Sequence, residues 1–241
     1  MNAATTTTPE PAATRELALL GEFAAAATHF LASPIGALLA NVEVGTALLE
    51  RPDAATRLPD VFQRLRAECL RCQLLLARLR EFVNALDELG FEHEVDLATV
   101  CREGLDAAVG AGACGPEQTE LVEYDPPPPA RRLPRAALVR VIEGLVHNAA
   151  QAGASNIHVS LAHDAHASLV CVRDDGPGIP TAILPRVTQP FFRAGKSDTL
   201  GLGLWFANEV ATRCGGTLSV ENHPGGGCVV CLRLPLQGPG N

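Results

Sequence analysis

The sequence predicts an α+β fold, in which a pair of long helices precedes a layered domain of strands and helices. Residues 16–90 carry apolar side chains at alternating three- and four-residue steps, which is the period of a helix. Residues 94–236 instead alternate helical segments with short strand-like runs. The chain has 241 residues, of which 47% are hydrophobic, so both parts have enough apolar content for a core.

Residues 1–15 are expected to form a disordered tail, because they are rich in alanine, threonine and proline and lack the basic-then-apolar order of a secretion signal. No apolar run is expected to approach the ~18 residues of a membrane span. These features predict a cytoplasmic protein without membrane insertion. The net charge of −8 argues against nucleic acid as a direct partner, since nucleic-acid binders usually present a basic face.

Two helices are predicted, over residues 16–50 and 58–89, with a break at Arg51-Pro52-Asp53 and an end at Gly90. The first carries an apolar row at Leu17, Leu20, Ala24, Ala27, Leu31 and Leu38. The second carries an uninterrupted seam at Phe62, Leu65, Cys69, Cys72, Leu76, Leu79, Val83 and Leu86. Such helices form an antiparallel hairpin, and two hairpins bury their apolar faces by pairing as a four-helix bundle. The pattern therefore predicts a homodimer.

The later elements follow from caps, alternation and breaker residues. Asp96 can cap a helix over residues 97–110, and residues 126–129 form a rigid proline-rich connector. Two more helices are predicted over 134–152 and 201–214, and strands over 119–124, 157–161, 169–173, 217–221 and 228–234. Residues 237–241 form a short tail.

The eight cysteines include two Cys-x-x-Cys pairs, whose spacing invites a zinc interpretation. Cys69 and Cys72 fall within the helical seam, and Cys228 and Cys231 lie three apart in a predicted strand, so they point to opposite faces. We therefore expect no metal at either pair. The cysteines are expected to pack as small hydrophobes in a reducing cytosol.

Two segments of the second part carry candidate site residues, although each is a weak signal by itself. Asn148 lies on a predicted helix, where its side-chain oxygen is a hard ligand suited to Mg²⁺. Asp174 ends a strand and is followed by Gly176 and Gly178. Such a carboxylate can accept a hydrogen bond from an exocyclic amine, and the glycines let the backbone approach a ring.

A third segment places Gly201 and Gly203 at the start of a helix, before Leu204. The free amides of a helix N-terminus suit phosphate groups. The stretch that contains Pro190-Phe191-Phe192 and Lys196 precedes it, and its proline and glycine content indicates a mobile cover over a nucleotide.

The order and spacing of these pieces resemble the ATPase domain shared by histidine kinases, gyrase, Hsp90 and MutL. The resemblance covers residues 94–236 and implies a Bergerat α/β sandwich that binds ATP and Mg²⁺. It implies that Asn148 holds the magnesium ion and that Asp174 binds adenine. The other implied nucleotide-binding residues are Gly176 and Gly178 beside the adenine, Gly201 and Gly203 near the phosphates, Leu204 and Lys196, with Phe191 and Phe192 as anchors of the lid.

The segment Thr28-His29-Phe30-Leu31-Ala32-Ser33-Pro34 resembles the phosphoacceptor box of histidine kinases. His29 neighbours the apolar row without belonging to it, so its ring can face out of the bundle. The resemblance implies that residues 16–90 form a dimerisation and phosphotransfer hairpin. In it His29 takes a phosphoryl group from ATP and passes it to an aspartate of a response-regulator receiver domain. Ser33 stands where the family has a residue that orients water for dephosphorylation, or is simply a helix surface residue.

Three positions depart from the family pattern. Phe30 stands where an acid usually orients the histidine and helps to take its proton. Gly144 replaces a second polar residue four positions before Asn148, and Gln151 replaces a basic residue three positions after it.

Three functions are compatible with this pattern. The first is a histidine kinase that phosphorylates His29 from Mg-ATP. The second is a phosphotransfer or regulatory module that binds nucleotide but autophosphorylates poorly. The third is an ATPase of the same superfamily without a phosphohistidine, or a serine kinase, and the hairpin that carries His29 argues against it.

Overall fold

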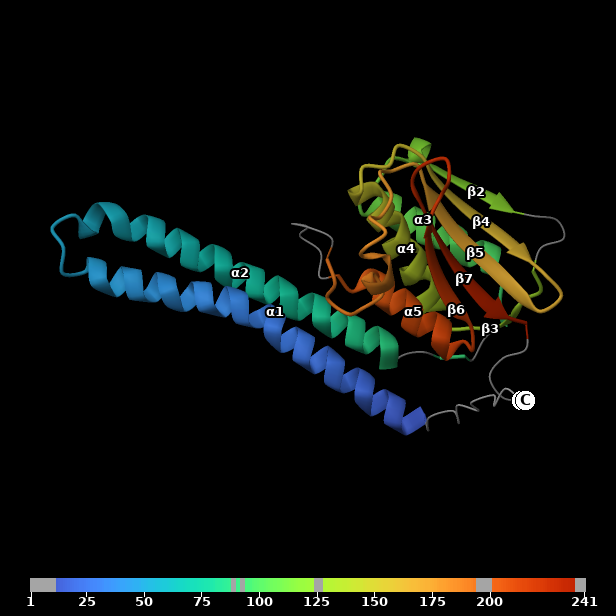
Figure 1. Cartoon of the computed structure of the whole chain (residues 1–241). Coiled ribbons are helices and arrows are strands. Elements are labelled where there is room, and N and C mark those ends of the chain that lie inside the picture. Colours follow the sequence, from blue (N-terminus) through green and yellow to red (C-terminus); the bar gives the residue numbers. More distant parts are fainter. Residues whose placement is uncertain (1–11, 88–89, 92–93, 124–127, 194–200, 237–241) are drawn as a thin grey trace. The chain divides into compact units, whose positions relative to one another are not determined.

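The computed structural model describes residues 12–87, 90–91, 94–123, 128–193 and 201–236 (Figure 1). The chain divides into two compact units, one up to Arg78 and one from Leu79 onward. The first unit is helical, and the second is a layered α/β domain. The sequence predicts a boundary nearer residue 90, whereas the division falls within the second long helix.

The first unit is an antiparallel hairpin of α1 (Ala12–Leu48) and α2 (Ala54–Asp87). The helix α1 begins at Ala12, so the expected tail over residues 1–15 was too long; residues 1–11 lie outside the described part. Pro34 sits inside α1 and is buried, and Pro52 lies in the turn between the helices, where a helical hydrogen bond is not required.

The two helices of the hairpin pack through one face of each. Leu48, Val61 and Leu75 are buried, and a Cβ at Gly45 would lie 3.4 Å from Val61, which shows how closely the backbones approach. Arg64 of α2 donates a hydrogen bond to Asn41 of α1 over 3.2 Å.

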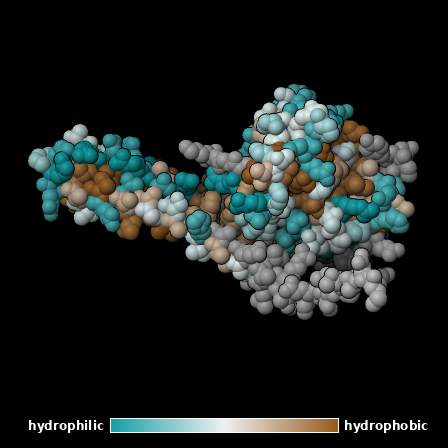
Figure 2. All heavy atoms as spheres, viewed as in Figure 1, coloured by the Kyte–Doolittle hydropathy of each residue, from teal (hydrophilic) through white to brown (hydrophobic). Residues whose placement is uncertain are grey.

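The predicted seam of α2 is split by this packing. Leu65 and Cys72 are half-buried, whereas Phe62, Cys69 and Leu76 remain exposed. The helix α1 shows a second exposed apolar row at Ile35, Leu39 and Val42. Figure 2 shows hydrophobic atoms along the hairpin surface. Each helix therefore has one apolar face inside the hairpin and another left open to solvent.

Phe23–Leu48 of α1 is long and apolar enough to cross a membrane, with a mean hydropathy of 1.5. The expectation that no segment approaches this length was therefore wrong. Length and composition do not by themselves assign a membrane position, because a core helix of a soluble protein or a signal sequence satisfies the same criterion.

The second unit contains one five-stranded sheet, with strands in the order β2-β4-β5-β7-β6. The strands are β2 (Thr119–Glu123), β4 (Ile157–His163), β5 (Ala167–Asp174), β6 (Thr217–Asn222) and β7 (Cys228–Pro235). The pair β2 and β4 is parallel and the other pairs are antiparallel. The predicted strands are present, and most are one or more residues longer than expected.

Three helices cover one face of this sheet: α3 (Leu97–Gly110), α4 (Arg135–Gln151) and α5 (Gly203–Arg213) (Figure 1). The side chain of Asp96 caps α3 by accepting hydrogen bonds from the amides of Ala98 and Thr99, as predicted. The sequence did not predict the short pair β1 (Glu94–Val95) and β3 (Arg131–Arg132), nor the 3₁₀ turns η1 (Pro116–Gln118) and η2 (Leu184–Arg186). These segments are too short to carry a periodic signal.

Alternate residues of the strands point toward the helices. In β4 the buried residues are Ile157, Val159 and Leu161. In β7 every second residue is buried, beginning at Cys228. Cys228 and Cys231 therefore lie on opposite faces of the sheet, as the sequence predicts. The α+β class and the layered α/β sandwich are confirmed.

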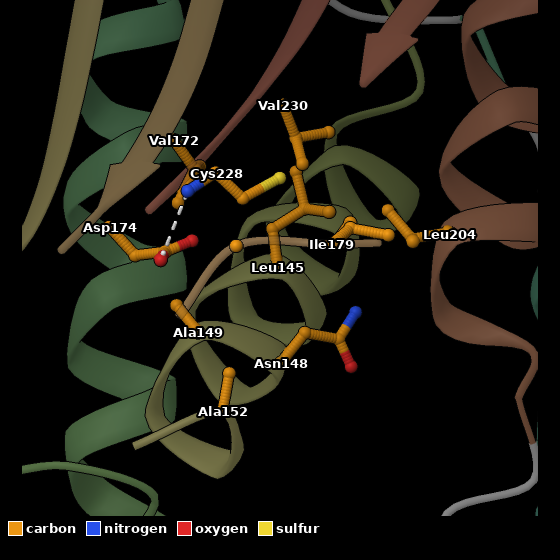
Figure 3. A pocket seen from close by; sticks show the side chains of 11 residues that line it. Leu145, Asn148, Ala149, Ala152, Val172, Asp174, Ile179, Leu204, Cys228 and Val230 are labelled. Carbon is orange, nitrogen blue, oxygen red and sulfur yellow. Dashed lines mark hydrogen bonds between the residues drawn. The ribbon is translucent and has the colours of Figure 1, made fainter. Parts of the chain in front are cut away.

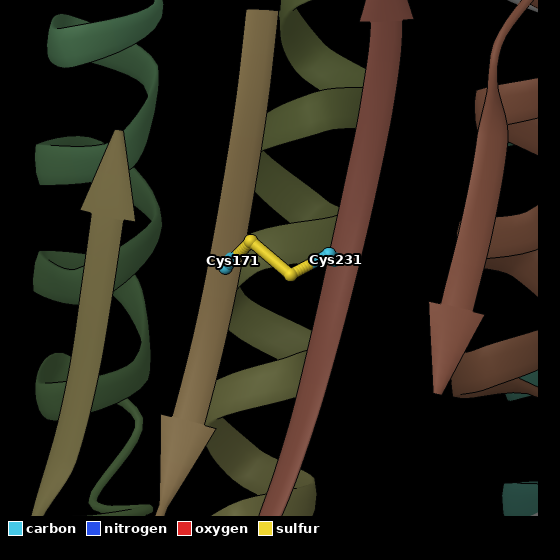
Figure 4. Close-up of a disulfide and its surroundings, with 2 residues drawn as sticks. All are labelled: Cys171 and Cys231. Carbon is cyan, nitrogen blue, oxygen red and sulfur yellow. A yellow bond between two sulfur atoms is a disulfide. The ribbon is translucent and has the colours of Figure 1, made fainter. Parts of the chain in front are cut away.

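One expectation about the cysteines was wrong. Cys171 and Cys231 form a disulfide across β5 and β7 on the outer face of the sheet, with α4 behind the strands (Figure 4). The two residues are directly opposite each other in the strand register. The pairing was not foreseen because Cys171 and Cys231 are 60 residues apart in sequence, and only the register brings them together.

Candidate nucleotide-binding site

The carboxylate of Asp174 lies at the C-terminal end of β5 and is held by backbone amides. The Oδ1 atom accepts hydrogen bonds from the amide of Gly176 over 2.9 Å and from that of Cys228 over 3.2 Å. The residue is only 9% exposed. Because the hydrogen bonds found in the described part of the chain use Oδ1, Oδ2 is available to a donor on a ligand, such as an exocyclic amine.

Glycines let neighbouring backbone segments pass close to one another around Asp174. Gly227 has a φ of +83°, and a Cβ there would collide with the backbone carbonyl oxygen of Asp174. Gly178 has a φ of +73°, and a Cβ there would lie 2.9 Å from Oδ1 of Asn222. Side chains are excluded from both positions by conformation and by space.

Asn222, at the end of β6, fixes the loop after Gly178. Its Oδ1 accepts a hydrogen bond from the amide of Ile179 over 2.7 Å, and its Nδ2 donates one to the Ile179 carbonyl over 2.6 Å. Asn222 was not predicted, because nothing in its local sequence distinguishes it from a turn residue.

Asp175 has a different task from its neighbour. It accepts hydrogen bonds from the amides of Ser155 and Asn156 and from the Asn156 side chain, at 2.7–2.9 Å. The hydrogen bonds from Asn156 are the main cause that lowers the pKa of this exposed carboxyl. Asp175 therefore ties the end of β5 to the start of β4, and Asp174 alone faces the cavity.

Asn148 lies on α4 and is half-buried at the edge of the same cavity (Figure 3). A Cβ on Gly203 would lie 3.1 Å from its Nδ2, so the first turn of α5 lies directly beside its amide. One amide oxygen, together with phosphate oxygens and water, is a usual set of Mg²⁺ ligands. The residues present therefore fit a magnesium ion carried by a nucleotide.

The N-terminus of α5 brings backbone amides to this edge. The helix begins at Gly203, and its cap residue Leu202 has no side-chain hydrogen bond to the first turn. The amides of the first turn have no helical acceptors, so they suit phosphate oxygens.

The turn before α5 is packed against the start of the predicted lid. Gly201 has a φ of +69°, and a Cβ there would collide with the carbonyl oxygen of Phe192. Phe191 itself has a φ of +61°, and the guanidinium of Arg186 lies 4.9 Å from the ring centroid of Phe192. Phe192 is thus in close contact with both Gly201 and Arg186. Lys196 lies outside the described residues.

These elements enclose a cavity of about 110 Å³ (Figure 3). Its lining comprises Leu145, Asn148, Ala149, Ala152, Val172, Asp174, Gly178, Ile179, Leu204, Cys228 and Val230. Of the predicted nucleotide-binding residues, Asn148, Asp174, Gly178 and Leu204 line it. The amide of Gly176 donates a hydrogen bond to Asp174, and Gly203 lies beside the side-chain amide of Asn148. Gly201 packs against the backbone of Phe192.

The sequence did not predict which residues form the apolar wall of the cavity. Val172 and Val230 are neighbours in the register of β5 and β7, and Cys228 follows the glycine turn. Burial raises the pKa of the Cys228 thiol to about 11, so it stays protonated at neutral pH. The available signal was the alternation of the last strand, which places every second residue inward.

Two of the three departures from the family pattern, Gly144 and Gln151, lie on α4. A Cβ on Gly144 would meet nothing within 4 Å. His147 and Gln151 share a hydrogen bond of 2.8 Å between their side chains. Gln151 is thus engaged with its own helix and brings no positive charge to the site.

The predicted phosphoacceptor lies in the other unit. His29 is exposed on α1, Ser33 is exposed one turn later, and Phe30 is half-buried. Within the single hairpin, His29 is therefore open to solvent.

Comparison with known proteins agrees with this geometry. Residues 134–238 match the family of histidine kinase-, DNA gyrase B- and HSP90-like ATPases. The chain is 33% identical over 221 residues to the signal transduction histidine-protein kinase AfsQ2 of Streptomyces coelicolor, covering 88% of this chain and 41% of that protein. It is 28% identical over 238 residues to the C4-dicarboxylate transport sensor protein DctS of Rhodobacter capsulatus, covering 95% of this chain and 35% of that protein.

A solved structure, the Acinetobacter baumannii histidine kinase AdeS, has the same fold. It superposes with a TM-score of 0.55 at 19% identity, over 87% of this chain and 98% of that one. Residues 134–238 of the second unit thus carry an ATPase domain of the histidine kinase, gyrase B and HSP90 class. Over most of its length the chain is similar to sensor histidine kinases. It spans less than half the length of these two curated relatives.

Gly227→Ala is expected to weaken nucleotide binding, because the added methyl group would displace the backbone of Asp174. The dissociation constant for an ATP analogue should rise about tenfold or more, equal to about 1.4 kcal/mol. Fluorescence anisotropy with a labelled analogue measures it. Gly226→Ala is the matched control, because Gly226 also has a positive φ, +95°, but open space around its Cβ position. Equal losses in both variants would contradict the close approach to Asp174.

Proposed function

We propose that this chain is a protein-histidine kinase that uses Mg-ATP to phosphorylate His29 and then transfers the phosphoryl group to a response-regulator aspartate. The observation that carries the proposal is the convergence of Asp174, Asn148 and the N-terminus of α5 on one cavity. The exposed His29 on a hairpin in the same chain supplies the acceptor.

Each part of the site has a separate task in this proposal. Asp174 accepts a hydrogen bond from the adenine amino group, and the apolar wall holds the ring. The amides of the α5 first turn and Asn148 position the phosphates. Magnesium, when bound with the nucleotide, neutralises charge on the phosphate oxygens.

The transfer is a displacement at phosphorus. A neutral ring nitrogen of His29 attacks the γ-phosphorus, and the bond from that phosphorus to the bridging oxygen of ADP breaks. The ring proton leaves to solvent or to a base. A carboxylate beside the histidine would normally take part in this step, and Phe30 has none.

ATP and response regulators occur in the cytoplasm, so we propose that both units of this chain work there. The apolar helix α1 is then a bundle helix, and its open apolar row is covered by another helix. We propose the same for the exposed seam of α2, which leads to a homodimer built as a four-helix bundle.

A second candidate function is a histidine phosphotransfer module that binds nucleotide but autophosphorylates poorly. Phe30 is the observation that favours it, because the residue beside His29 has no proton acceptor. In that case His29 would receive its phosphoryl group from another protein.

Incubation with γ-labelled ATP and Mg²⁺ is expected to give an acid-labile, alkali-stable label on the wild-type chain. The label should be lost in His29→Ala, which lacks the acceptor, and in Asn148→Ala, which lacks the proposed metal ligand. Nucleotide binding, measured in parallel, should persist in His29→Ala. Binding without any label would instead support the phosphotransfer module, and the absence of binding would refute the nucleotide site.

Phe30→Glu is expected to raise the rate of autophosphorylation, since it restores a proton acceptor beside His29. Acid–base help of this kind contributes ~10²-fold or more, and initial rates of label incorporation measure it. Phe30→Gln is the matched control, with a similar shape and no charge. An unchanged rate in Phe30→Glu would show that this position does not limit proton removal.

The chain is expected to dimerise through its hairpin at micromolar concentration. Leu76 is 53% exposed in the single chain, within an apolar row. Leu76→Glu should therefore shift the protein to monomer, because it would place a charge in the dimer interface. Light scattering after size exclusion measures the mass. Gln73→Glu, an exposed polar position on the same helix, should leave the dimer intact. A wild-type monomer under these conditions would rule the dimer out.

A further inference from the structure

The disulfide between Cys171 and Cys231 lies outside the nucleotide cavity, on the open face of the sheet (Figure 4). Both residues are half-buried, whereas their strand neighbours Val172 and Val230 are buried on the helix side. A small thiol or disulfide can therefore reach the sulfur atoms from solvent without opening the core.

The strand register connects this disulfide to the cavity. Cys171 pairs with Cys231, and the next pair, Val172 with Val230, forms part of the cavity wall. Asp174 and Cys228 lie at the end of the same two strands, where the Cys228 amide donates to Oδ1 of Asp174 over 3.2 Å. The covalent link is thus one residue pair away from the wall and three residues along each strand from this hydrogen bond.

Three of the other four cysteines of the domain are unsuited to thiol exchange, and the fourth, Cys114, is half-buried and forms no disulfide with a described residue. Cys101, Cys214 and Cys228 are buried free thiols. Burial is the main cause that raises the pKa of Cys101 to about 12 and that of Cys214 to about 11. A redox response of this domain would therefore be concentrated at the pair on the outer face.

We propose that Cys171 and Cys231 form a reversible thiol–disulfide pair that sets the affinity of the adjacent cavity for nucleotide. The inference rests on the proposed nucleotide site and adds its regulation. In the oxidised state the two strands are joined beside the cavity wall, so Asp174 and the two valines are preorganised for the base. In the reduced state only the ladder hydrogen bonds hold this pair, and the strand ends move more freely.

Oxidised glutathione is the co-reactant that takes up the electrons of the two protein thiols. The thiolate of one cysteine attacks a sulfur of oxidised glutathione, and a glutathione thiolate leaves. The second cysteine thiolate then attacks the protein sulfur of the mixed disulfide, and a second glutathione thiolate leaves. Two electrons pass from the protein thiols to glutathione, and the two thiol protons go to solvent or to the leaving thiolates. Reduction runs through the same steps in reverse.

Nucleotide affinity in defined glutathione buffers tests the proposal. The full chain is equilibrated with oxidised or with excess reduced glutathione, and free thiols are alkylated and counted by mass spectrometry. The oxidised form should show six free cysteines and the reduced form eight. The dissociation constant for a fluorescent ATP analogue with Mg²⁺ should be about three- to tenfold higher in the reduced form, as expected from lost preorganisation.

Two double variants separate this pair from the other thiols. Cys171→Ser/Cys231→Ser should bind like the reduced wild type in both buffers. Cys69→Ser/Cys72→Ser, in the hairpin, should keep the full response. Thermal unfolding checks that each variant is folded, and the comparison of the two wild-type states needs no substitution.

Three results would overturn the inference: equal affinities in the two buffers, eight free thiols in oxidised glutathione, or a bond that excess reduced glutathione leaves intact. Equal but measurable affinities would leave the nucleotide site in place. No binding in either buffer would remove the nucleotide site together with its regulation.

Discussion

The hydrogen bonds to Oδ1 of Asp174 are the constraint on which the nucleotide site depends. They join the end of β5 to the Gly176 turn and to the first residue of β7, so one carboxylate fixes three chain segments. A buried carboxylate is costly unless amides hold it, and here the amides also determine which oxygen faces the cavity. Gly227 has no room for a side chain because it packs on the backbone of Asp174, and Gly178 has none because it packs on Asn222.

The position of Asn148 depends on a different contact. The first turn of α5 lies so close to its amide that a Cβ at position 203 would be 3.1 Å from Nδ2 of Asn148. The proposed metal ligand and the amides proposed for the phosphates are therefore neighbours, whereas Asp174, proposed for the base, lies on the sheet. Gly144 and Gln151, which depart from the family pattern, lie on the same helix as Asn148.

The hairpin presents a different physical problem, since each of its helices has two apolar faces and the partner helix covers only one. Leu65 and Cys72 are covered within the hairpin, and Phe62, Cys69 and Leu76 are not. The apolar face of α2 is therefore wider than the surface that α1 covers. In a four-helix bundle each helix packs on two neighbours, and such a wide apolar face is what it needs. The same excess of apolar surface makes α1 long and apolar enough for a membrane span, so hydropathy alone does not separate the two interpretations.

The sequence by itself determined the order of the main helices and strands, the cap at Asp96 and the glycine positions, because these depend on local chemistry and short spacings. The candidate roles of Asn148, Asp174 and His29 came from the resemblance to a known family. Only the tertiary structure decided that Asp175 binds the amides of Ser155 and Asn156. It also decided that Cys228 and Val230 form the wall, that Asn222 clamps the loop and that Cys171 meets Cys231. These depend on pairing between segments distant in sequence, and strand register, which sets such pairing, leaves no local signal.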